Sequence, residues 1–264
     1  MDAYLIAAFL GLVEGLTEFL PVSSTGHLVL LVDLLNFQAP PGKAFEIVIQ
    51  LGAVLAVCVV YWRRLLTAAL GMFHVPQERM FVRNILIAFL PAMVVGALAY
   101  PMIRRMLDSP VVVAAALVIG GIAILAIERL VREPRHSAIE KFSAGLALRI
   151  GIVQVLSMIP GVSRSGATIM GALMMGVERK TAAEFSFFLA IPTMAGATAY
   201  SIYKNYADLS FDDVGLIATG FTVAFVSAML VVRTAVAFIG RHGFAPFAWY
   251  RIVVGTVMLA LLAF

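Results

Sequence analysis

The sequence predicts an all-α integral membrane protein with six transmembrane helices and two re-entrant helical hairpins, arranged as an inverted-topology repeat. Three observations support this prediction. Of the 264 residues, 62% are hydrophobic and only 13% are charged, and the mean hydropathy is +1.01, far above that of soluble globular domains. Several apolar stretches reach the length of about 20 residues that a spanning helix requires. Two other segments carry polar, proline- and glycine-rich breaks, and they resemble each other.

Six apolar stretches are long enough to cross a bilayer. They lie near residues 44–62, 82–101, 110–128, 183–203, 213–238 and 246–264.

Basic residues gather in the connections on one predicted side of the membrane: Arg63, Arg64, Arg79, Arg83, Arg129, Arg132, Arg135, Lys141, Arg149, Arg179, Lys180, Arg233, Arg241 and Arg251. The opposite tips combine a few basic residues with aspartates: Lys43, Arg104, Arg105, Lys204, Asp33, Asp108, Asp208, Asp212 and Asp213. The positive-inside rule makes the first set cytoplasmic and places both termini outside. The role of the basic residues in setting orientation accounts for the net charge of +4. We therefore expect no nucleic-acid partner.

The two halves of the chain match at an offset of 140 residues. Residues 11–17 align without a gap on residues 151–157, and Pro21–Gly26 aligns on Gly161–Gly166. In each half, three predicted spans follow the matching segment. Because three crossings deliver the second half to the opposite face, the repeats must be inverted.

We therefore expect one membrane domain over residues 1–264. Its first repeat would be 1–130, with a hairpin at 3–36, and its second repeat would be 143–264, with a hairpin at 143–176.

The broken segment that opens each repeat predicts a hairpin, because a proline after an apolar run ends or kinks a helix. A helical pattern resumes at 25–35 and at 166–176. Irregular backbone at membrane depth requires surrounding protein or a water-filled cavity. Hairpins entering from opposite faces would meet near the midplane and line a shared cavity. The spacing of Gly11 and Gly15 also predicts close approach of the first hairpin helix to a neighbour.

Glu14 and Glu18 are four residues apart and would share one helix face. Each carboxylate would cost about 3 kcal/mol at lipid depth, and two neighbouring carboxylates repel unless a divalent metal or a proton separates them. The alternative is an amphipathic surface helix with hydrated glutamates. Thr17 and the hydroxyl groups that follow favour the buried arrangement.

The segment Pro160–Thr168 places Arg164 among three hydroxyl groups and two glycines, at the start of a helical pattern. Backbone amides at a helix N-terminus favour anions, and a guanidinium group matches phosphate oxygens. This combination predicts a phosphoryl-binding site. The alternative is an ordinary polar loop whose arginine reaches a lipid headgroup.

Other polar residues lie in or beside the predicted membrane segments. His27 follows two serines and would serve as a general acid, base or nucleophile, or as a structural hydrogen-bonding residue. Glu46, Gln50 and Glu184 would contribute to the site or satisfy the hairpin backbones.

Two motifs resemble those of the undecaprenyl-diphosphatases of the bacitracin-resistance type. Glu14–His27, EGLTEFLPVSSTGH, is similar to the family's glutamate-rich motif, and Pro160–Thr168, PGVSRSGAT, is similar to its PGxSRSxxT motif. The stretch from Phe45 to Gly52 also resembles the family, as do the chain length and the pattern of spans.

The resemblance implies hydrolysis of undecaprenyl diphosphate, a C55 isoprenyl lipid, to undecaprenyl phosphate and inorganic phosphate. It further implies recycling of the carrier lipid for bacterial cell-wall synthesis, bacitracin resistance, a Mg²⁺ or Ca²⁺ cofactor, and an inner-membrane location with a site open to the periplasmic face. A homodimer is one expectation for its assembly. The resemblance assigns catalytic roles to Glu14, Glu18, Ser24, His27 and Arg164, metal binding to Glu14 and Glu18, and substrate contacts to Ser23, Thr25, Ser163, Arg164, Ser165, Gly166 and Thr168.

The sequence leaves the nucleophile open between Ser24, His27 and a water held by Glu18. A secondary transporter would share the inverted repeats and broken helices. The acid-phosphatase-like lipid phosphatases are excluded, because their later motif requires a histidine where this chain has Met170. A purely structural membrane protein gives no reason to bury Glu14, Glu18 and Arg164.

Overall fold

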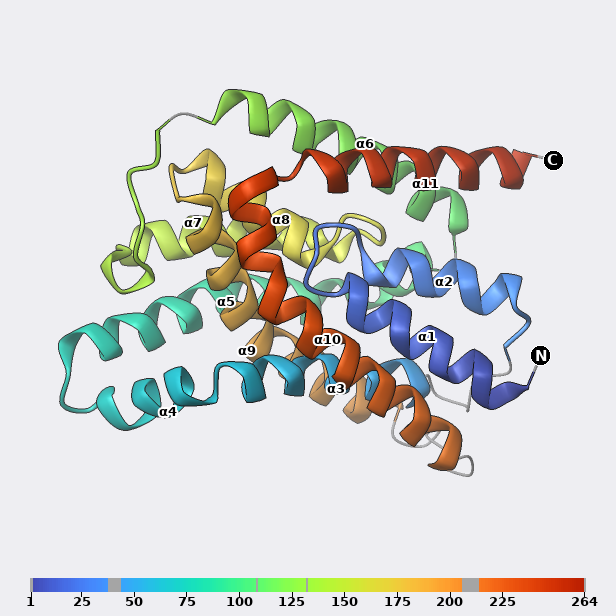
Figure 1. The fold of residues 1–264 in the computed structure, drawn as a ribbon, viewed down its shortest axis with the longest axis horizontal. Helices are drawn as coiled ribbons and strands as arrows, with labels where there is room; N and C mark the ends of the chain where they lie inside the picture. The colour runs from blue at the N-terminus through green and yellow to red at the C-terminus, as the bar shows by residue number, and fades with distance from the viewer. Residues whose placement is uncertain (1, 38–43, 108, 132, 206–213, 264) are drawn as a thin grey trace.

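The computed structural model describes residues 2–37, 44–107, 109–131, 133–205 and 214–263, and within them every regular element is a helix. The α-helices are α1 (Ala3–Thr17), α2 (Ser24–Leu34), α3 (Ala44–Val60), α4 (Trp62–Gly71), α5 (Pro76–Leu107), α6 (Pro110–Leu130), α7 (Ala144–Gln154), α8 (Arg164–Met174), α9 (Arg179–Asn205), α10 (Val214–His242) and α11 (Ala245–Ala263), with 3₁₀ turns η2 (Ile139–Lys141) and η3 (Val155–Met158). The predicted all-α class is confirmed (Figure 1).

Five of the described helices, α5, α6, α9, α10 and α11, are long and apolar enough to cross a bilayer. A sixth candidate is the pair α3 and α4, which is bent by 74°. The chain is therefore a multi-pass membrane protein, while six spans remain a prediction. Helix α4 was not predicted, because Arg63 and Arg64 indicated a basic connection rather than a helix.

Both predicted hairpins are helix–break–helix segments. The first runs from α1 through the turn at residues 18–23 into α2, and the second runs from α7 and η3 through residues 159–163 into α8. Helices α2 and α8 begin at Ser24 and Arg164, positions that the sequence alignment pairs. The two turns lie side by side near the centre of the molecule (Figure 1). The inversion of the repeats remains a prediction.

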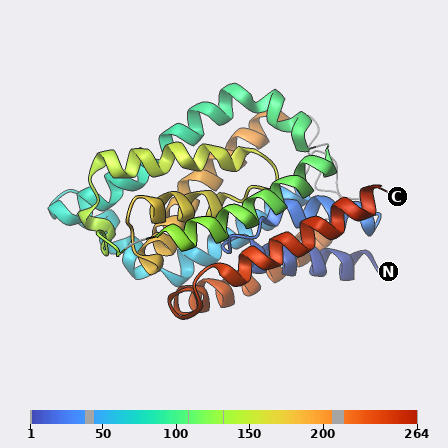
Figure 2. The ribbon, with the colours of Figure 1, turned by 90° about the horizontal axis from the view of Figure 1, so that it is seen from above.

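The first hairpin packs closely on α10. A Cβ atom added at Gly11 would lie 2.3 Å from the Gly220 carbonyl oxygen, and one added at Gly15 would lie 2.1 Å from Ser227 Oγ. These distances leave no room for a side chain and confirm the predicted close approach. On another side of the molecule, α6 and α11 run alongside each other (Figure 2).

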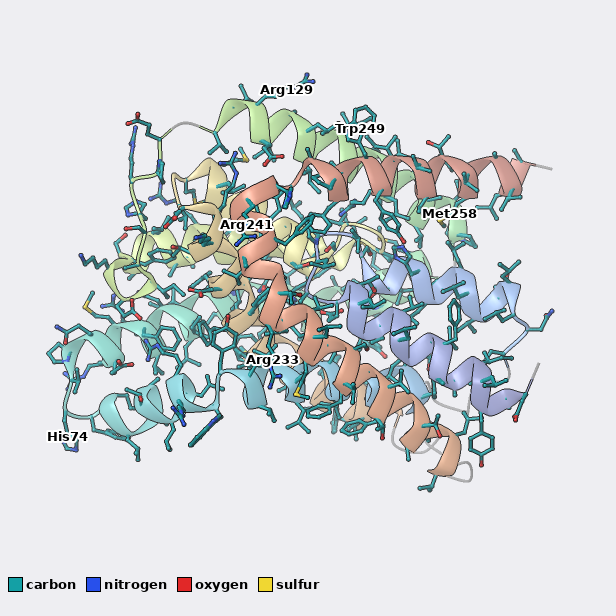
Figure 3. The ribbon with its side chains drawn as sticks, in the orientation of Figure 1. His74, Arg129, Arg233, Arg241, Trp249 and Met258 are labelled. Carbon is teal, nitrogen blue, oxygen red and sulfur yellow. The ribbon has the colours of Figure 1, made fainter. Side chains whose placement is uncertain are left out.

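The two chain ends lie at one end of the molecule, and the connection between α4 and α5 lies at the other (Figure 1). His74, in that connection, is labelled in Figure 3. This arrangement matches the prediction that both termini share one side, and which side is periplasmic stays a prediction. Several charged residues used for that prediction lie outside the described residues: Lys43, Asp108, Arg132, Asp208, Asp212 and Asp213.

One member of the predicted cytoplasmic set was misplaced. Arg251 lies inside α11 and is only 1% exposed. The positive-inside rule counts basic residues without knowing whether protein buries them. Arg251 is therefore an interior residue rather than part of a basic connection.

Candidate active site

An ion pair joins the two hairpins. Glu18 lies just after α1, and Arg164 is the first residue of α8. Arg164 Nη2 donates to Glu18 Oε1 at 3.1 Å, and the two side chains are only 10% and 7% exposed. Buried charges of opposite sign in contact satisfy each other. The predicted meeting of a carboxylate from one hairpin with a guanidinium from the other is present in the structure.

The second oxygen of Glu18 accepts a short hydrogen bond from the Ser24 hydroxyl. Ser24 is the first residue of α2 and is 5% exposed. A hydroxyl that donates to a carboxylate is oriented for loss of its proton. Ser24 and Glu18 therefore have the geometry of a nucleophile and its general base.

The residue before each of these helices is a serine with positive φ. Ser23 has φ 70° and Ser163 has φ 77°. Ser23 Oγ accepts from the backbone N–H of Gly26 at 3.3 Å, and Ser163 Oγ accepts from that of Gly166 at 3.1 Å. Each serine thus caps its helix, and the positive φ turns the chain sharply out of the preceding break.

Arg164 is also fixed from the side of α9. Its Nη1 donates to the carbonyl oxygen of Ser186 at 2.7 Å and to Ser186 Oγ at 3.2 Å. Its guanidinium carbon lies 5.8 Å from the centre of the Phe19 ring, within the range of a cation–π contact. Among the described residues, Arg164 Nε has no hydrogen-bond partner. Of the five N–H donors of this partly buried arginine, three are therefore bonded and two have no partner among the described residues.

Three further predicted substrate-binding residues stabilise the second turn. Ser165 Oγ donates to the Leu20 carbonyl oxygen at 2.7 Å and lies 3.0 Å from Ser163 Oγ. Thr168 Oγ1 donates to the Arg164 carbonyl oxygen at 2.9 Å, within its own helix. Gly166 offers its backbone N–H to Ser163. The structure thus gives these residues contacts that hold the turn, and their contact with substrate remains a prediction.

His27 is tied to the protein at both ring nitrogens. Nδ1 lies 2.7 Å from the Ser23 carbonyl oxygen, and Nε2 lies 2.7 Å from the Tyr250 hydroxyl. A carbonyl oxygen only accepts, so Nδ1 donates, and in the neutral ring Nε2 accepts from Tyr250. The two rings are stacked, with centroids 5.5 Å apart. His27 is thus held in place beside Ser23, and its catalytic assignment remains a prediction.

Glu14 is completely buried one turn before Glu18, and neither carboxylate oxygen has a hydrogen-bond partner among the described residues. An unpaired buried carboxylate requires a proton or a cation nearby. The described residues bring together no group of three His, Cys, Asp or Glu side chains able to hold a metal. Magnesium is usually held by one or two carboxylates plus substrate phosphates, and metal binding by Glu14 and Glu18 remains a prediction.

A cavity of about 310 Å³ opens beside the ion pair. Its polar lining includes Glu18, Ser23, Ser24, Thr25, Gln50, Ser157, Ser163, Arg164 and Thr193, and its apolar lining includes Ile103, Leu107, Met158, Met194 and Ala197. A cavity with a charged part and an aliphatic part fits a ligand with the same division, such as an anionic headgroup on a hydrocarbon chain. Glu14 and His27 lie behind this lining, in the surrounding protein.

Two of the other intramembrane polar residues, Gln50 and Glu184, line different cavities. Gln50, on α3, lines the cavity beside Arg164. Glu184, on α9, lines a separate cavity of about 290 Å³ together with Tyr61, Arg64 and Glu140. Glu184 therefore belongs to a different part of the protein from the candidate site.

Sequence reasoning missed Ser186, Tyr250 and Arg251. Ser186 and Tyr250 contact Arg164 and His27, and Arg251 contacts the backbone of both turns. Ser186 and Tyr250 are uncharged residues in apolar helices, so their residue types do not mark them as functional. Arg251 could have been recognised, because an arginine six residues into a predicted span is costly unless protein surrounds it.

Together these features define a class: multi-pass membrane proteins with an amphipathic intramembrane cavity, in which an arginine, a carboxylate and a serine hydroxyl converge. The chain belongs to the family described as "Bacitracin resistance protein BacA", whose match covers residues 7–257.

Curated relatives agree with this assignment along nearly the whole chain. The protein named "Undecaprenyl-diphosphatase 2" from Paramagnetospirillum magneticum is 60% identical over 256 residues, which is 97% of this chain and 98% of the relative. The "Undecaprenyl-diphosphatase" of Sphingopyxis alaskensis is 59% identical over 96% of each chain. That of Caulobacter vibrioides is 52% identical over 99% of this chain and 98% of its own.

Proposed function

We propose that the protein hydrolyses undecaprenyl diphosphate to undecaprenyl phosphate and inorganic phosphate, and so recycles the carrier lipid for cell-wall synthesis and confers bacitracin resistance. The observation that carries this proposal is the contact between Glu18, Ser24 and Arg164 at the wall of a partly apolar cavity. Membership of the family and the names of the relatives support the same activity.

Binding of the diphosphate would use the cationic side of the site. Phosphoryl transfer depends mainly on positioning and on neutralising charge at the phosphate oxygens. Arg164 lines the cavity and has N–H donors that no described residue accepts, so its guanidinium would donate to the terminal phosphate. Its other donors remain anchored on Glu18 and Ser186, so the guanidinium is oriented before the lipid arrives.

The hydrogen bond from Ser24 to Glu18 supports Ser24 as the nucleophile. In this route Ser24 Oγ attacks the terminal phosphorus, its proton passes to Glu18, and the bond to the bridging oxygen breaks, releasing undecaprenyl phosphate. Water then hydrolyses the phosphoserine and releases inorganic phosphate. In the alternative, Glu18 takes a proton from a water that attacks directly. For His27 to act as the nucleophile, its Nε2 atom would first have to lose the hydrogen bond to the Tyr250 hydroxyl.

A divalent cation, Mg²⁺ or Ca²⁺, would be held by Glu14 and Glu18 and would supply charge neutralisation at the phosphates. The buried, unpaired carboxylate of Glu14 supports this assignment. With Glu14 changed to Gln, we expect a higher Mg²⁺ concentration for half-maximal activity and less protection against heat by the metal alone. Equal metal dependence in Glu14→Gln and the native protein would exclude Glu14 as a ligand.

The decisive experiment measures phosphate release from undecaprenyl diphosphate by purified protein in detergent. We expect activity in the native protein and a loss of at least about 100-fold in Glu18→Gln, as expected for removal of a general base. Arg164→Ala should lose a comparable amount, and Arg241→Ala, at an exposed arginine on α10, serves as the control. A secondary transporter would move the lipid across vesicles without releasing phosphate.

A second measurement separates the two nucleophiles. The native protein is mixed rapidly with substrate labelled at the terminal phosphate and quenched in acid. A labelled phosphoserine that disappears in Ser24→Ala supports the covalent route. If no labelled protein forms while Ser24→Ala keeps part of its activity, water held by Glu18 is the nucleophile.

We further propose a bacterial inner-membrane location, with the cavity open to the periplasmic face, and assembly as a homodimer without nucleic acid. The apolar helices support the membrane location. A cysteine placed at Leu107, which lines the cavity, in a Cys58→Ser background should react with an impermeant thiol reagent added to intact spheroplasts. Reaction only after lysis would place the opening on the cytoplasmic side.

A further inference from the structure

Arg251 is buried beside the candidate site, and its guanidinium makes five hydrogen bonds. An arginine has five N–H donors, and here five hydrogen bonds run from the guanidinium to backbone carbonyl oxygens. Nε donates to Leu117 at 3.3 Å, Nη1 donates to Pro21 at 3.1 Å and to Val162 at 2.9 Å, and Nη2 donates to Ala116 at 3.0 Å and to Gly161 at 2.8 Å. None of these partners is a carboxylate, so the guanidinium stabilises backbone carbonyl groups and does not neutralise a negative charge.

The five carbonyl groups belong to three separate segments. Pro21 lies in the turn of the first hairpin, Gly161 and Val162 lie in the turn of the second, and the other two carbonyls belong to α6. Carbonyl groups in turns have no helical partner, and at membrane depth they are costly to leave unbonded. Arg251 meets this need for both turns at once and fixes the distance between them.

The bonded carbonyls of the two turns lie just before residues that line the cavity. Val162 is followed by Ser163 and Arg164, and Pro21 lies three positions before Ser24. Movement of either turn would therefore change the alignment of Arg164 with Ser24 and Glu18.

A glycine on α6 makes room for this guanidinium. A Cβ atom added at Gly120 would lie 2.1 Å from Arg251 Nη2 and 2.7 Å from its Cζ. Both distances are far below van der Waals contact, so even alanine at position 120 would displace the guanidinium. Gly120 thus gives a second way to disturb the bonds of Arg251 while keeping the arginine.

We propose that Arg251 is a positioning residue for catalysis: it ties the turns of the two hairpins together so that Glu18 and Ser24 face Arg164 in one geometry. It does this through backbone carbonyl groups and does not line the cavity itself. This inference rests on the proposed hydrolase function for its kinetic consequence, but the tie between the turns is independent of any reaction.

The kinetic test compares Arg251→Ala, Arg251→Lys and Gly120→Ala with the native protein and with Arg241→Ala. A displacement of about 1 Å in an active site can cost about 100-fold in rate, so we expect kcat to fall by about that factor in Arg251→Ala and Gly120→Ala. We expect KM to change by less than about threefold, because the apolar lining is untouched. Arg251→Lys should retain intermediate activity, since a lysine has three donors.

The double variant Arg251→Ala, Gly120→Ala isolates the contact. Without a guanidinium to displace, the methyl group at position 120 should cost nothing further, so the double variant should match Arg251→Ala. Multiplied losses would overturn the proposal, as would a kcat within threefold of the native value in folded Arg251→Ala. If all three single variants fail to fold, Arg251 is purely structural and the proposal is wrong.

A measurement without substrate separates this inference from the proposed function. Spin labels at Leu16 and Leu156, which are 38% and 54% exposed, report the separation of the two hairpins in a Cys58→Ser background. We expect a broader distance distribution in Arg251→Lys than in the labelled parent, and no change in Arg241→Ala. Unchanged distances would show that Arg251 does not hold the two turns together. Broadened distances in a protein without phosphatase activity would support the link between the turns and exclude the hydrolase function.

Discussion

Ser23 and Ser163 occupy aligned positions in the two halves of the chain, and both have positive φ while capping the helix that follows. Their φ angles are 70° and 77°, and each side chain accepts the N–H group three residues ahead. Positive φ costs a residue with a Cβ atom about 1–2 kcal/mol, and the serine cap returns about 1 kcal/mol. Each turn is therefore stabilised by a cap at a strained position.

This balance predicts opposite effects of two small substitutions at Ser163. Alanine loses the cap and keeps the strain, so Ser163→Ala should lower stability by about 1 kcal/mol. Glycine loses the cap but adopts positive φ freely, so Ser163→Gly should be at least as stable as Ser163→Ala. Thermal unfolding in detergent measures both, and a higher midpoint for alanine would contradict the strain argument.

The contacts of His27 predict a modest role in the reaction. His27→Asn keeps a donor for the Ser23 carbonyl oxygen and loses the bond to Tyr250, so kcat should fall by about fivefold, the effect of one hydrogen bond of about 1 kcal/mol. Tyr250→Phe should have the same effect. A loss of about 1000-fold in His27→Asn with little effect of Tyr250→Phe would instead identify His27 as an acid, base or nucleophile.

The apolar part of the cavity predicts a residue that affects binding without affecting chemistry. Leu107, the last residue of α5, belongs to the apolar lining of the cavity. Leu107→Ala removes about 1 kcal/mol of apolar contact with the lipid chain, so KM for undecaprenyl diphosphate should rise by about fivefold while kcat stays constant.

Leu98→Ala is the matched control, because Leu98 is on the same helix and is 80% exposed. Equal KM values in the two variants would show that the prenyl chain does not use this part of the cavity.

The sequence was sufficient for the parts of the site that a motif carries locally. The alignment of the halves predicted that residues near Ser24 and Arg164 start equivalent helices, and inverted hairpins predicted that their tips meet. The signals for the helix ends are local in the sequence: a proline ends one helix, and a hydroxyl-rich turn begins the next. That topology predicted that Glu18 and Arg164 lie close together, and the structure adds that they form a direct ion pair.

Contacts between helices distant in sequence were beyond such reasoning. Arg251 was assigned to a connection because its charge was counted without its depth, and the partners of its guanidinium are backbone carbonyls, which leave no trace in residue type. Helix α4 was missed because its arginines indicated a connection, although Arg64 in fact bonds Glu78 and Glu140 in the structure. In both cases tertiary packing, which the local sequence does not reveal, determines where the arginine lies.

Substitution of Gly15 tests whether the close packing of α1 on α10 is required. A Cβ atom there would meet Ser227 Oγ at 2.1 Å and the Ala224 carbonyl oxygen at 2.4 Å, so Gly15→Ala must push α1 away from α10. Overpacking of this kind costs about 1–3 kcal/mol, and because Glu18 follows directly after α1, the displacement should also reduce kcat. Gly145→Ala, at a helical glycine with nothing within 4 Å, should leave kcat unchanged and should not lower stability, because alanine favours a helix more than glycine does. Thermal unfolding and phosphate release measured on the same preparations test the pair, and equal behaviour of the two variants would show that α1 tolerates a shift on α10.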